Sequence, residues 1–154
     1  MNRRLNIREE AGGMKKILIA IDGSEHSQKA LEEGRKFAEA FCSEVILLNV
    51  VNDFKHNYFH ESVYLYEQTK ESFEQQGKNI IEKAGSVFDG FCGTLITEIK
   101  IGDPAEQIIN AIETIDPDLI VMGSKGLTGI KKVVIGSVSD KVLHHTNKPI
   151  LIVR

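Results

Sequence analysis

The stretch KILIAIDGS, residues 16–24, sets a pattern that the rest of the chain repeats. Its five consecutive apolar residues, Ile17 to Ile21, are typical of a strand whose two faces are both covered by helices. Asp22, Gly23 and Ser24 then interrupt the run, and Ser24 can cap the first turn of a following helix. The stretch therefore predicts a buried strand that passes through a tight turn into a helix.

Similar apolar runs recur at residues 45–51, 95–101, 119–122 and 150–153. The run at 95–101 is the most polar, because Thr97, Glu98 and Lys100 lie within it, which is typical of a strand at a sheet edge. Segments with helical periodicity separate the runs. This alternation of five strands and four helices predicts a single-domain α/β fold, with a doubly wound five-stranded parallel sheet and helices on both faces.

The four predicted helices have apolar faces or recognisable ends. Residues 24–41 are expected to bury Ala30, Phe37, Ala38 and Phe41, and residues 62–88 to bury Phe73, Ile80, Ile81, Ala84, Val87 and Phe88. Gly77 weakens the second of these helices by about 1 kcal/mol relative to Ala. Asp103 followed by Pro104 is a start signal for the third helix. The fourth begins near Ser137 and ends by Asn147.

The composition fits one globular domain, because 42% of the 154 residues are hydrophobic and 27% are charged. Residues 1–13 are expected to be a flexible leader, and residues 14–154 the folded domain. The longest apolar runs hold about five residues, far fewer than the roughly 18 of a membrane-spanning helix. Nineteen basic and 22 acidic side chains, without a basic stripe, argue against nucleic acid as a partner.

The two cysteines, Cys42 and Cys92, are far apart in the sequence and fit no CxxC spacing. This pattern indicates buried, reduced thiols rather than a disulfide or a zinc site. Reduced thiols in turn favour a cytoplasmic protein.

The glycine-rich loop after the fourth strand is the strongest functional signal. Gly123 and Gly126 open the loop, and Gly136, Ser137 and Ser139 stand at the head of the last helix. Glycines let a ligand approach the backbone, and a helix start offers free N–H groups to an anion. In a doubly wound sheet the loop lies at the carboxyl ends of the strands, where ligands bind. A tight turn and a helix entry would explain the same glycines, so both interpretations stay open at this point.

The spacing Gly123-x2-Gly126-x9-Gly136-Ser137 resembles the nucleotide-binding signature of the universal stress protein family, specifically of its ATP-binding branch. Residues 16–24, 45–50, 102–104 and 147–153 are similar to the family in the same order. The resemblance implies an adenine nucleotide alpha hydrolase-like fold with strand order 3-2-1-4-5. It also implies that ATP binds between the ends of the first and fourth strands, and that a homodimer forms through the last strand.

The resemblance further implies a set of cofactor-binding residues along the nucleotide. Ile21 and Val50 would line the base pocket, and Asp22 would hold the ribose or the adenine edge. The remaining members would lie beside the nucleoside or the phosphates: Met122, Gly123, Lys125, Gly126, Gly136, Ser137, Val138 and Ser139. Asp22 is also explained as a turn cap after the strand. Mg²⁺ is expected with the nucleotide, held mainly by the phosphates themselves.

No residues in the sequence define a catalytic or metal site. His56 and His60 have helical spacing, but zinc needs three or four ligands. His144 and His145 are adjacent, and a position near a helix C-terminus explains them. No Ser–His–Asp order or Cys–His pair indicates a nucleophilic centre. A phosphorylated receiver domain is disfavoured because Asp103 is better explained as a helix cap.

Three functions are compatible with these residues. The first is a nucleotide-binding regulatory or stress-response protein, in which ATP shifts a loop or dimer equilibrium and there is little or no catalysis. The second is a slow ATPase or phosphotransferase at the same site, although phosphoryl transfer normally needs metal-holding acids. The third is a dimerising module with a vestigial nucleotide site, against which the complete glycine signature argues. The sequence does not specify a protein client.

Overall fold

A computed structural model describes residues 13–52, 63–127 and 135–154, with side chains from residue 70 onward in the helix that begins at Val63. The strands are β1 (Lys16–Ile21), β2 (Glu44–Val51), β3 (Thr94–Ile101), β4 (Leu119–Gly123) and β5 (Ile150–Val153). The helices are α2 (Glu25–Phe41), α3 (Val63–Ser86), α4 (Pro104–Ile115) and α5 (Ser137–His145). The leader, apart from Gly13, and the pair His56 and His60 lie outside the described residues.

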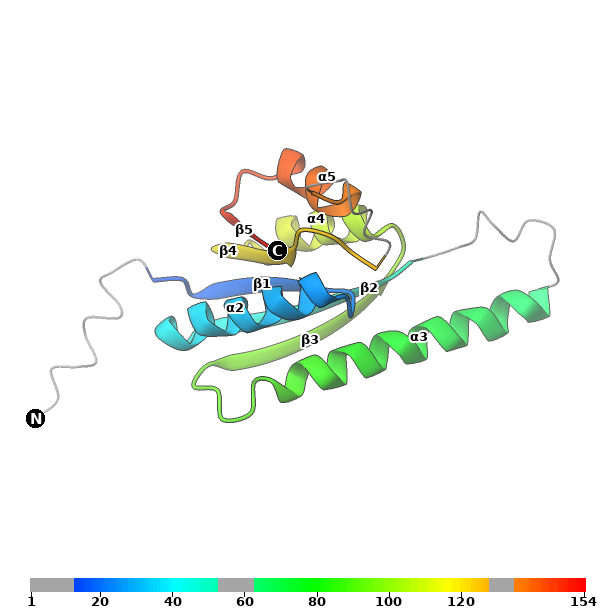
Figure 1. Cartoon of the computed structure of the whole chain (residues 1–154), viewed down its shortest axis with the longest axis horizontal. Coiled ribbons are helices and arrows are strands. Elements are labelled where there is room, and N and C mark those ends of the chain that lie inside the picture. Colours follow the sequence, from blue (N-terminus) through cyan, green and yellow to red (C-terminus); the bar gives the residue numbers. More distant parts are fainter. Residues whose placement is uncertain (1–12, 53–62, 128–134) are drawn as a thin grey trace, which may run out of the picture.

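The strands form one parallel sheet in the order β3-β2-β1-β4-β5 (Figure 1). The predicted fold class and strand order are therefore confirmed. β3 lies at one edge, as its polar residues predicted, and β5 lies at the other. β1 lies in the centre, between β2 and β4. The order reverses direction at β1, so the carboxyl ends of β1 and β4 form the switch point where such sheets bind ligands.

Two hydrophobic layers cover the central strand, one on each face of the sheet. Ile17, Ile19 and Ile21 pack in the layer under α2 and α3, and Leu18 and Ala20 pack in the layer under α4 and α5. Because strand side chains alternate between faces, none of these five residues is more than 7% exposed. Burial on both faces explains the unbroken apolar run in the sequence.

The helix ends follow the capping residues in the sequence. The Ser24 hydroxyl accepts a hydrogen bond from the backbone N–H of Ser27 at the start of α2. The Asp103 carboxylate accepts one from the N–H of Glu106, and Pro104 is the first residue of α4. Each side-chain oxygen satisfies an N–H group that has no partner within its helix. The predicted caps of α2 and α4 are confirmed.

Gly77 lies where α3 packs closely against β2. A Cβ atom at this position would lie 2.9 Å from Asn49 Oδ1 and 2.9 Å from Val51 Cγ2. The Asn49 side chain is fixed in place, because its Nδ2 donates to the Ile21 carbonyl at 2.8 Å. Glycine at position 77 therefore lowers the helix propensity of α3 but allows the helix to approach the sheet closely.

Phe37 and Phe41 lie outside the core, so the prediction that α2 buries them is wrong. Their exposed fractions are 38% and 45%. Arg35, on the opposite flank of α2, donates to the Val87 carbonyl after α3. The two phenylalanines therefore lie on the flank away from α3, toward β4 and β5, which α2 also contacts. β5 is the last strand at that edge in the described part of the chain, and no further strand there covers them.

Cys42 and Cys92 form a disulfide, so the prediction of reduced thiols is wrong. Cys42 stands two residues before β2 and Cys92 two residues before β3. The first residues of these parallel strands, Glu44 and Thr94, are direct partners in the register. Parallel pairing therefore brings the two cysteines together, with their Cα atoms 5.2 Å apart, despite a sequence separation of 50.

Candidate functional site

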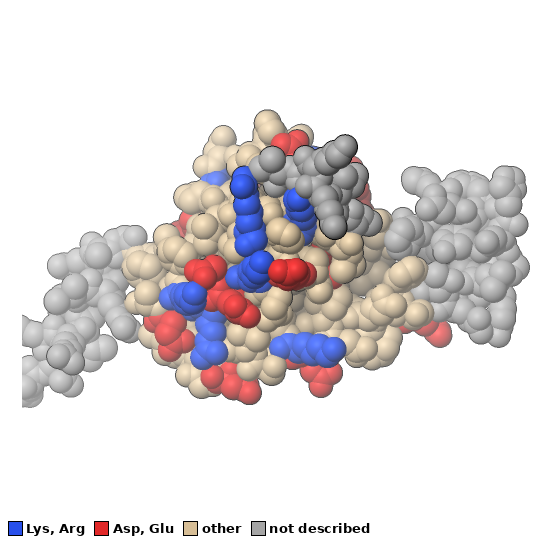
Figure 2. Space-filling model, viewed as in Figure 1, with Lys and Arg blue, Asp and Glu red and all other residues tan. Residues whose placement is uncertain are grey.

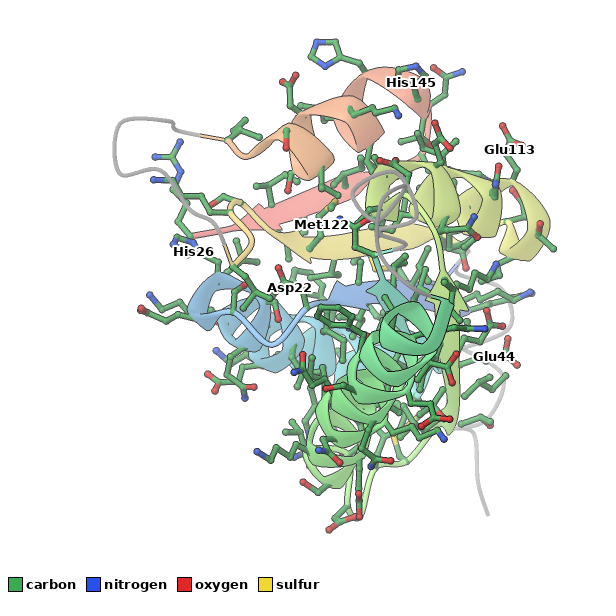
Figure 3. All side chains as sticks on the ribbon, turned by 90° about the vertical axis from the view of Figure 1, so that its right-hand side faces the viewer. Asp22, His26, Glu44, Glu113, Met122 and His145 are labelled. Atoms are coloured by element: carbon green, nitrogen blue, oxygen red, sulfur yellow. A yellow bond between two sulfur atoms is a disulfide. The ribbon has the colours of Figure 1, made fainter. Side chains whose placement is uncertain are left out.

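A cavity of about 480 Å³ opens at the carboxyl ends of β1, β2 and β4. Its lining includes every predicted site residue except Gly136, namely Ile21, Asp22, Val50, Met122, Gly123, Lys125, Gly126, Ser137, Val138 and Ser139. Asp22 and Met122 lie around the ends of β1 and β4, whereas Glu113 and His145 lie apart from them (Figure 3). The structure thus brings together residues from four separate segments of the sequence.

The backbone after β4 is held by hydrogen bonds from three other elements. At the start of α2, the Ser24 hydroxyl donates to the Lys125 carbonyl at 3.3 Å. From α5, the Ser139 hydroxyl donates to the Gly123 carbonyl at 2.7 Å. The carbonyl of Val153, at the end of β5, accepts from the Ser124 N–H at 2.7 Å. This backbone therefore reaches the cavity in a defined conformation.

Gly136 lies behind this backbone rather than in the cavity lining. Its N–H donates to the Ser124 carbonyl at 2.6 Å, and a Cβ atom on Gly136 would lie 3.3 Å from the same oxygen. Gly136 is also the N-cap of α5, without a side chain to accept a hydrogen bond from the first turn. The first N–H groups of α5, beginning at Ser137, are thus available to an anion at the edge of the cavity.

The two opening glycines lie in close contact with the start of α2 and with the turn after β1. A Cβ atom on Gly123 would lie 2.7 Å from the backbone carbon of His26 and 2.8 Å from the nitrogen of Ser27. A Cβ atom on Gly126 would lie 2.7 Å from Asp22 Oδ2. The absence of a side chain at Gly123 therefore allows β4 to pack against the backbone of α2. The absence of one at Gly126 leaves space between the loop and the Asp22 carboxylate.

Asp22 is a turn cap, as one interpretation of the sequence predicted. Its Oδ1 accepts a hydrogen bond from the Ser24 N–H at 2.9 Å. Its own N–H and that of Gly23 donate to the Ser27 hydroxyl, both at 3.2 Å. Oδ2 faces Gly126 in the cavity lining. The cap leaves this second oxygen for a ligand, and the predicted contact with a nucleoside stays a prediction.

The chain is similar to known proteins over almost its whole length. The family model described as the universal stress protein family matches residues 13–154. This chain belongs to the universal stress protein family. Universal stress protein MJ0577 of Methanocaldococcus jannaschii is 31% identical in a match that covers 91% of this chain and 94% of the relative.

Solved structures of universal stress proteins share the fold. The structure of MJ0577 has a TM-score of 0.80, with 31% identity, and covers 91% of this chain and 95% of its own. A universal stress protein in complex with cAMP has a TM-score of 0.68 at 20% identity, covering 92% of this chain and 98% of its own. A family protein from Arabidopsis thaliana with AMP bound has a TM-score of 0.65 at 19% identity, covering 90% of both chains.

Helix α3 forms a wall of the cavity that was not predicted from the sequence. Phe73, Gln76, Gly77 and Ile80 of α3 line the cavity. Their spacing of three, four and seven places them on one face of the helix. The same periodicity marked Phe73 and Ile80 as apolar core, whereas no sequence signal indicated that Gln76 and Gly77 line a cavity. Ile80 also packs beside Gly23, because a Cβ atom on that glycine would lie 3.2 Å from Ile80 Cδ1. This face of α3 thus lines the cavity and also packs against the hydrophobic core.

Among the described residues, the charged groups that line the cavity are Asp22, Asp103 and Lys125. Asp103 is 3.5 Å from Lys141 of α5. Next to the site, a side-chain hydrogen bond from Lys29 lowers the pKa of Glu25 in the first turn of α2. Within the described ranges, no group of three His, Cys, Asp or Glu residues is placed to hold a metal ion. The oxygen atoms of the described lining therefore fit Mg²⁺ only when a nucleotide is bound. The phosphates would then hold the ion, with Asp22 as the adjacent carboxylate.

The outer surface has no segregated charge on the face drawn in Figure 2. Lys and Arg side chains there are interspersed with Asp and Glu. Among the helices of the described residues, none is both long and apolar enough to span a membrane.

Proposed function

We propose that this universal stress protein binds ATP and acts as a nucleotide-dependent regulatory or stress-response protein, with little or no catalysis. The observation that carries the proposal is a cavity whose lining combines two kinds of surface. One part of the lining consists of apolar side chains, among them Val50 and Ile108. The other consists of the glycine-rich loop at Gly126 and the start of α5 from Ser137. An apolar surface suits a base, and backbone N–H groups at a helix start suit phosphates.

The relatives support an adenine nucleotide as the ligand. One neighbour with the same fold was solved with cAMP and another with AMP bound. The complete glycine signature in this chain favours a ligand that also carries further phosphates. When bound with the nucleotide, Mg²⁺ would neutralise phosphate oxygens, and the Asp22 carboxylate lies beside Gly126 of the loop that would face them.

A regulatory role is favoured over phosphoryl transfer by the acids around the cavity. Asp103 is committed to capping α4, since it accepts from the Glu106 N–H at 2.9 Å. Asp22 is committed through Oδ1 to the turn after β1. Phosphoryl transfer needs groups that hold the metal and orient the nucleophile. For both tasks the described lining offers only the second oxygens of these two capping carboxylates, so we expect hydrolysis to be slow or absent.

Gly126→Val is expected to remove ATP binding while the protein stays folded. The new side chain would begin 2.7 Å from Asp22 Oδ2, which is the end of a side chain and not backbone, so the fold can adjust. The valine would, however, fill the space between the loop and the carboxylate. Calorimetric titration with ATP and Mg²⁺ should show micromolar binding by the unmutated protein, about −8 kcal/mol, and none by the variant.

Gly85→Ala is the matched control for this titration. Its Cβ atom would lie 3.9 Å from Leu95 Cδ2, an ordinary contact far from the cavity lining. The control should bind ATP as the unmutated protein does. Absence of ATP binding by the unmutated protein would contradict the proposal and favour a dimerising module.

We propose further that two copies of the chain associate through β5. All four residues of this edge strand, Ile150–Val153, are partly exposed although all are apolar. Phe37 and Phe41 of α2 extend the apolar surface on one face. Exposed edge strands are normally covered, and an isolated apolar edge would promote aggregation. A second copy would cover both the strand and the two phenylalanines.

Light scattering tests the dimer. The unmutated protein should have the mass of two chains at micromolar concentration, and the double variant Phe37→Glu, Phe41→Glu should have the mass of one. Lys36→Glu changes the net charge by the same amount on the same helix, and Lys36 is 69% exposed. This control should stay dimeric. A single-chain mass for the unmutated protein would exclude the proposed dimer.

The domain boundary and the cytoplasmic location belong to the same proposal. The family match from residue 13 supports residues 14–154 as the domain and residues 1–13 as a leader. In the cytosol disulfides are mostly transient. The partly exposed Cys42 and the exposed Cys92 would make their bridge accessible to thiols there. The proposal therefore implies a bridge that opens and closes in the cell.

A further inference from the structure

Ser124 is the residue at which three elements meet behind the cavity. It is fully buried, with an exposed fraction of 0%. Its N–H donates to the Val153 carbonyl of β5, and its carbonyl accepts from the Gly136 N–H at the start of α5. Its hydroxyl oxygen lies 3.0 Å from Nδ1 of His26 in α2. Every polar group of Ser124 thus has a partner, and the partner of the hydroxyl is a side chain.

His26 holds the same stretch of backbone in two ways. The hydrogen bond to Ser124 forms whether the hydroxyl donates to Nδ1 or an Nδ1–H donates to the hydroxyl. The backbone of His26 also packs against Gly123, where a Cβ atom would approach its carbonyl carbon to 2.7 Å. His26 itself is absent from the cavity lining, whereas Gly123, Lys125 and Gly126 are part of it. His26 therefore contacts the loop from behind.

We propose that His26 is a positioning residue, which acts through Ser124 to set the backbone of Lys125 and Gly126 for the phosphates of the bound nucleotide. Without the imidazole, the Ser124 hydroxyl would be buried with no partner, a costly arrangement that a rotation of the loop would relieve. Lys125 and Gly126 follow Ser124 directly, so the rotation would displace the groups that face the phosphates. The inference rests on the proposed function and adds the residue that fixes the loop that would face the phosphates.

The effect should be confined to the contacts with the phosphates. The apolar side chains Val50 and Ile108 of the cavity lining belong to β2 and α4. His26 has no hydrogen bond to these two elements among the described residues. The interaction with Ser124 should therefore contribute to the affinity for ATP and not to the affinity for adenosine, which has no phosphates.

His26→Ala tests the proposal by calorimetric titration with ATP and Mg²⁺ and, separately, with adenosine. We expect the dissociation constant for ATP to rise by about tenfold or more, and that for adenosine to change by less than about twofold. His26→Asn should restore most of the ATP affinity, because its side chain places a hydrogen-bonding atom the same number of bonds from Cα as Nδ1. His145→Ala is the control, since that imidazole bonds the Lys141 carbonyl within α5.

A second variant and a second measurement separate positioning from a general loss of structure. Ser124→Ala removes the hydroxyl itself, so it should weaken ATP binding less than His26→Ala does. His26→Ala should add little in the Ser124→Ala background, because no buried hydroxyl is then left without a partner. In the nucleotide-free protein, amide hydrogen exchange of residues 123–126 should be faster in His26→Ala and return to normal in His26→Asn. Unfolding temperatures of the variants are measured alongside.

Three results would overturn the inference. They are unchanged ATP affinity in His26→Ala, equal weakening for ATP and adenosine, and no rescue by His26→Asn. A different result would overturn the proposed function instead: an unmutated protein that binds neither ATP nor adenosine. In that case hydrogen exchange at residues 123–126 alone decides whether His26 holds the loop, and unchanged exchange in His26→Ala would refute it.

Discussion

Reducing the Cys42–Cys92 disulfide is expected to lower the free energy of unfolding by about 4 kcal/mol. The bridge closes a loop with a sequence separation of 50, which contains β2 and α3. In the chain-entropy description, a cross-link stabilises the folded state by restricting the unfolded chain, and the effect grows with loop length. For a protein of this size the loss corresponds to a midpoint lower by about 10 °C.

Thermal and urea unfolding with and without a dithiol reductant measure this loss. The double variant Cys42→Ser, Cys92→Ser should unfold at the midpoint of the reduced protein, and the reductant should not change it further. This double variant is the control for effects of the reductant elsewhere. Equal stability of the oxidised and reduced protein would show that the bridge does not constrain the unfolded chain as expected.

Gly123→Ala is expected to destabilise the protein by about 3 kcal/mol and to abolish ATP binding. The added Cβ atom would collide with backbone on the other side, 2.7 Å from the His26 carbonyl carbon and 2.8 Å from the Ser27 nitrogen. Backbone atoms cannot rotate away as the end of a side chain can, so α2 and β4 would have to separate. The loop that continues from Gly123 into the cavity would move with them.

Urea unfolding of Gly123→Ala and of Gly85→Ala gives the comparison. Gly85 lies in α3, and its Cβ atom would make only an ordinary contact at 3.9 Å. Gly85→Ala should be neutral or more stable by up to about 1 kcal/mol, because alanine favours the helix. Equal stabilities for the two variants would mean that β4 and α2 can separate at little cost.

The fold was predictable because its signals are local. The run Ile17 to Ile21 is buried on both faces, and strands with this pattern belong to parallel sheets. Caps such as Ser24 and Asp103 mark helix starts without reference to the rest of the chain. The edge position of β3 followed from its polar residues in the same way. Each of these features depends on neighbours within a few residues.

The errors concern relations between distant segments. The disulfide depends on the register of β2 and β3, which pairs Glu44 with Thr94, and spacing along the chain does not reveal it. The exposure of Phe37 and Phe41 depends on where the sheet ends.

The residues of the candidate site also fall into those that local sequence signals predicted and those that depend on the assembled fold. Glycines and the helix start at Ser137 were recognisable, because they reflect what the backbone must do. The part formed by Phe73 and Gln76 was missed, because a helix face that lines a cavity has the same periodicity as one that lines a core. The position of the helix relative to the strand ends distinguishes the two, and only the assembled fold provides it.

α3 spans the sheet between the end of β2 and the start of β3 (Figure 1). Just after its C-terminal end, Arg35 donates to the carbonyls of Val87 and Asp89, close in sequence to Cys92 of the disulfide. Phe73, in the cavity wall, lies about 20 Å along the axis from Ser86. A tilt of about 3° about the C-terminal end would carry the cavity wall by about 1 Å, and the close packing of Gly77 against β2 resists such a tilt.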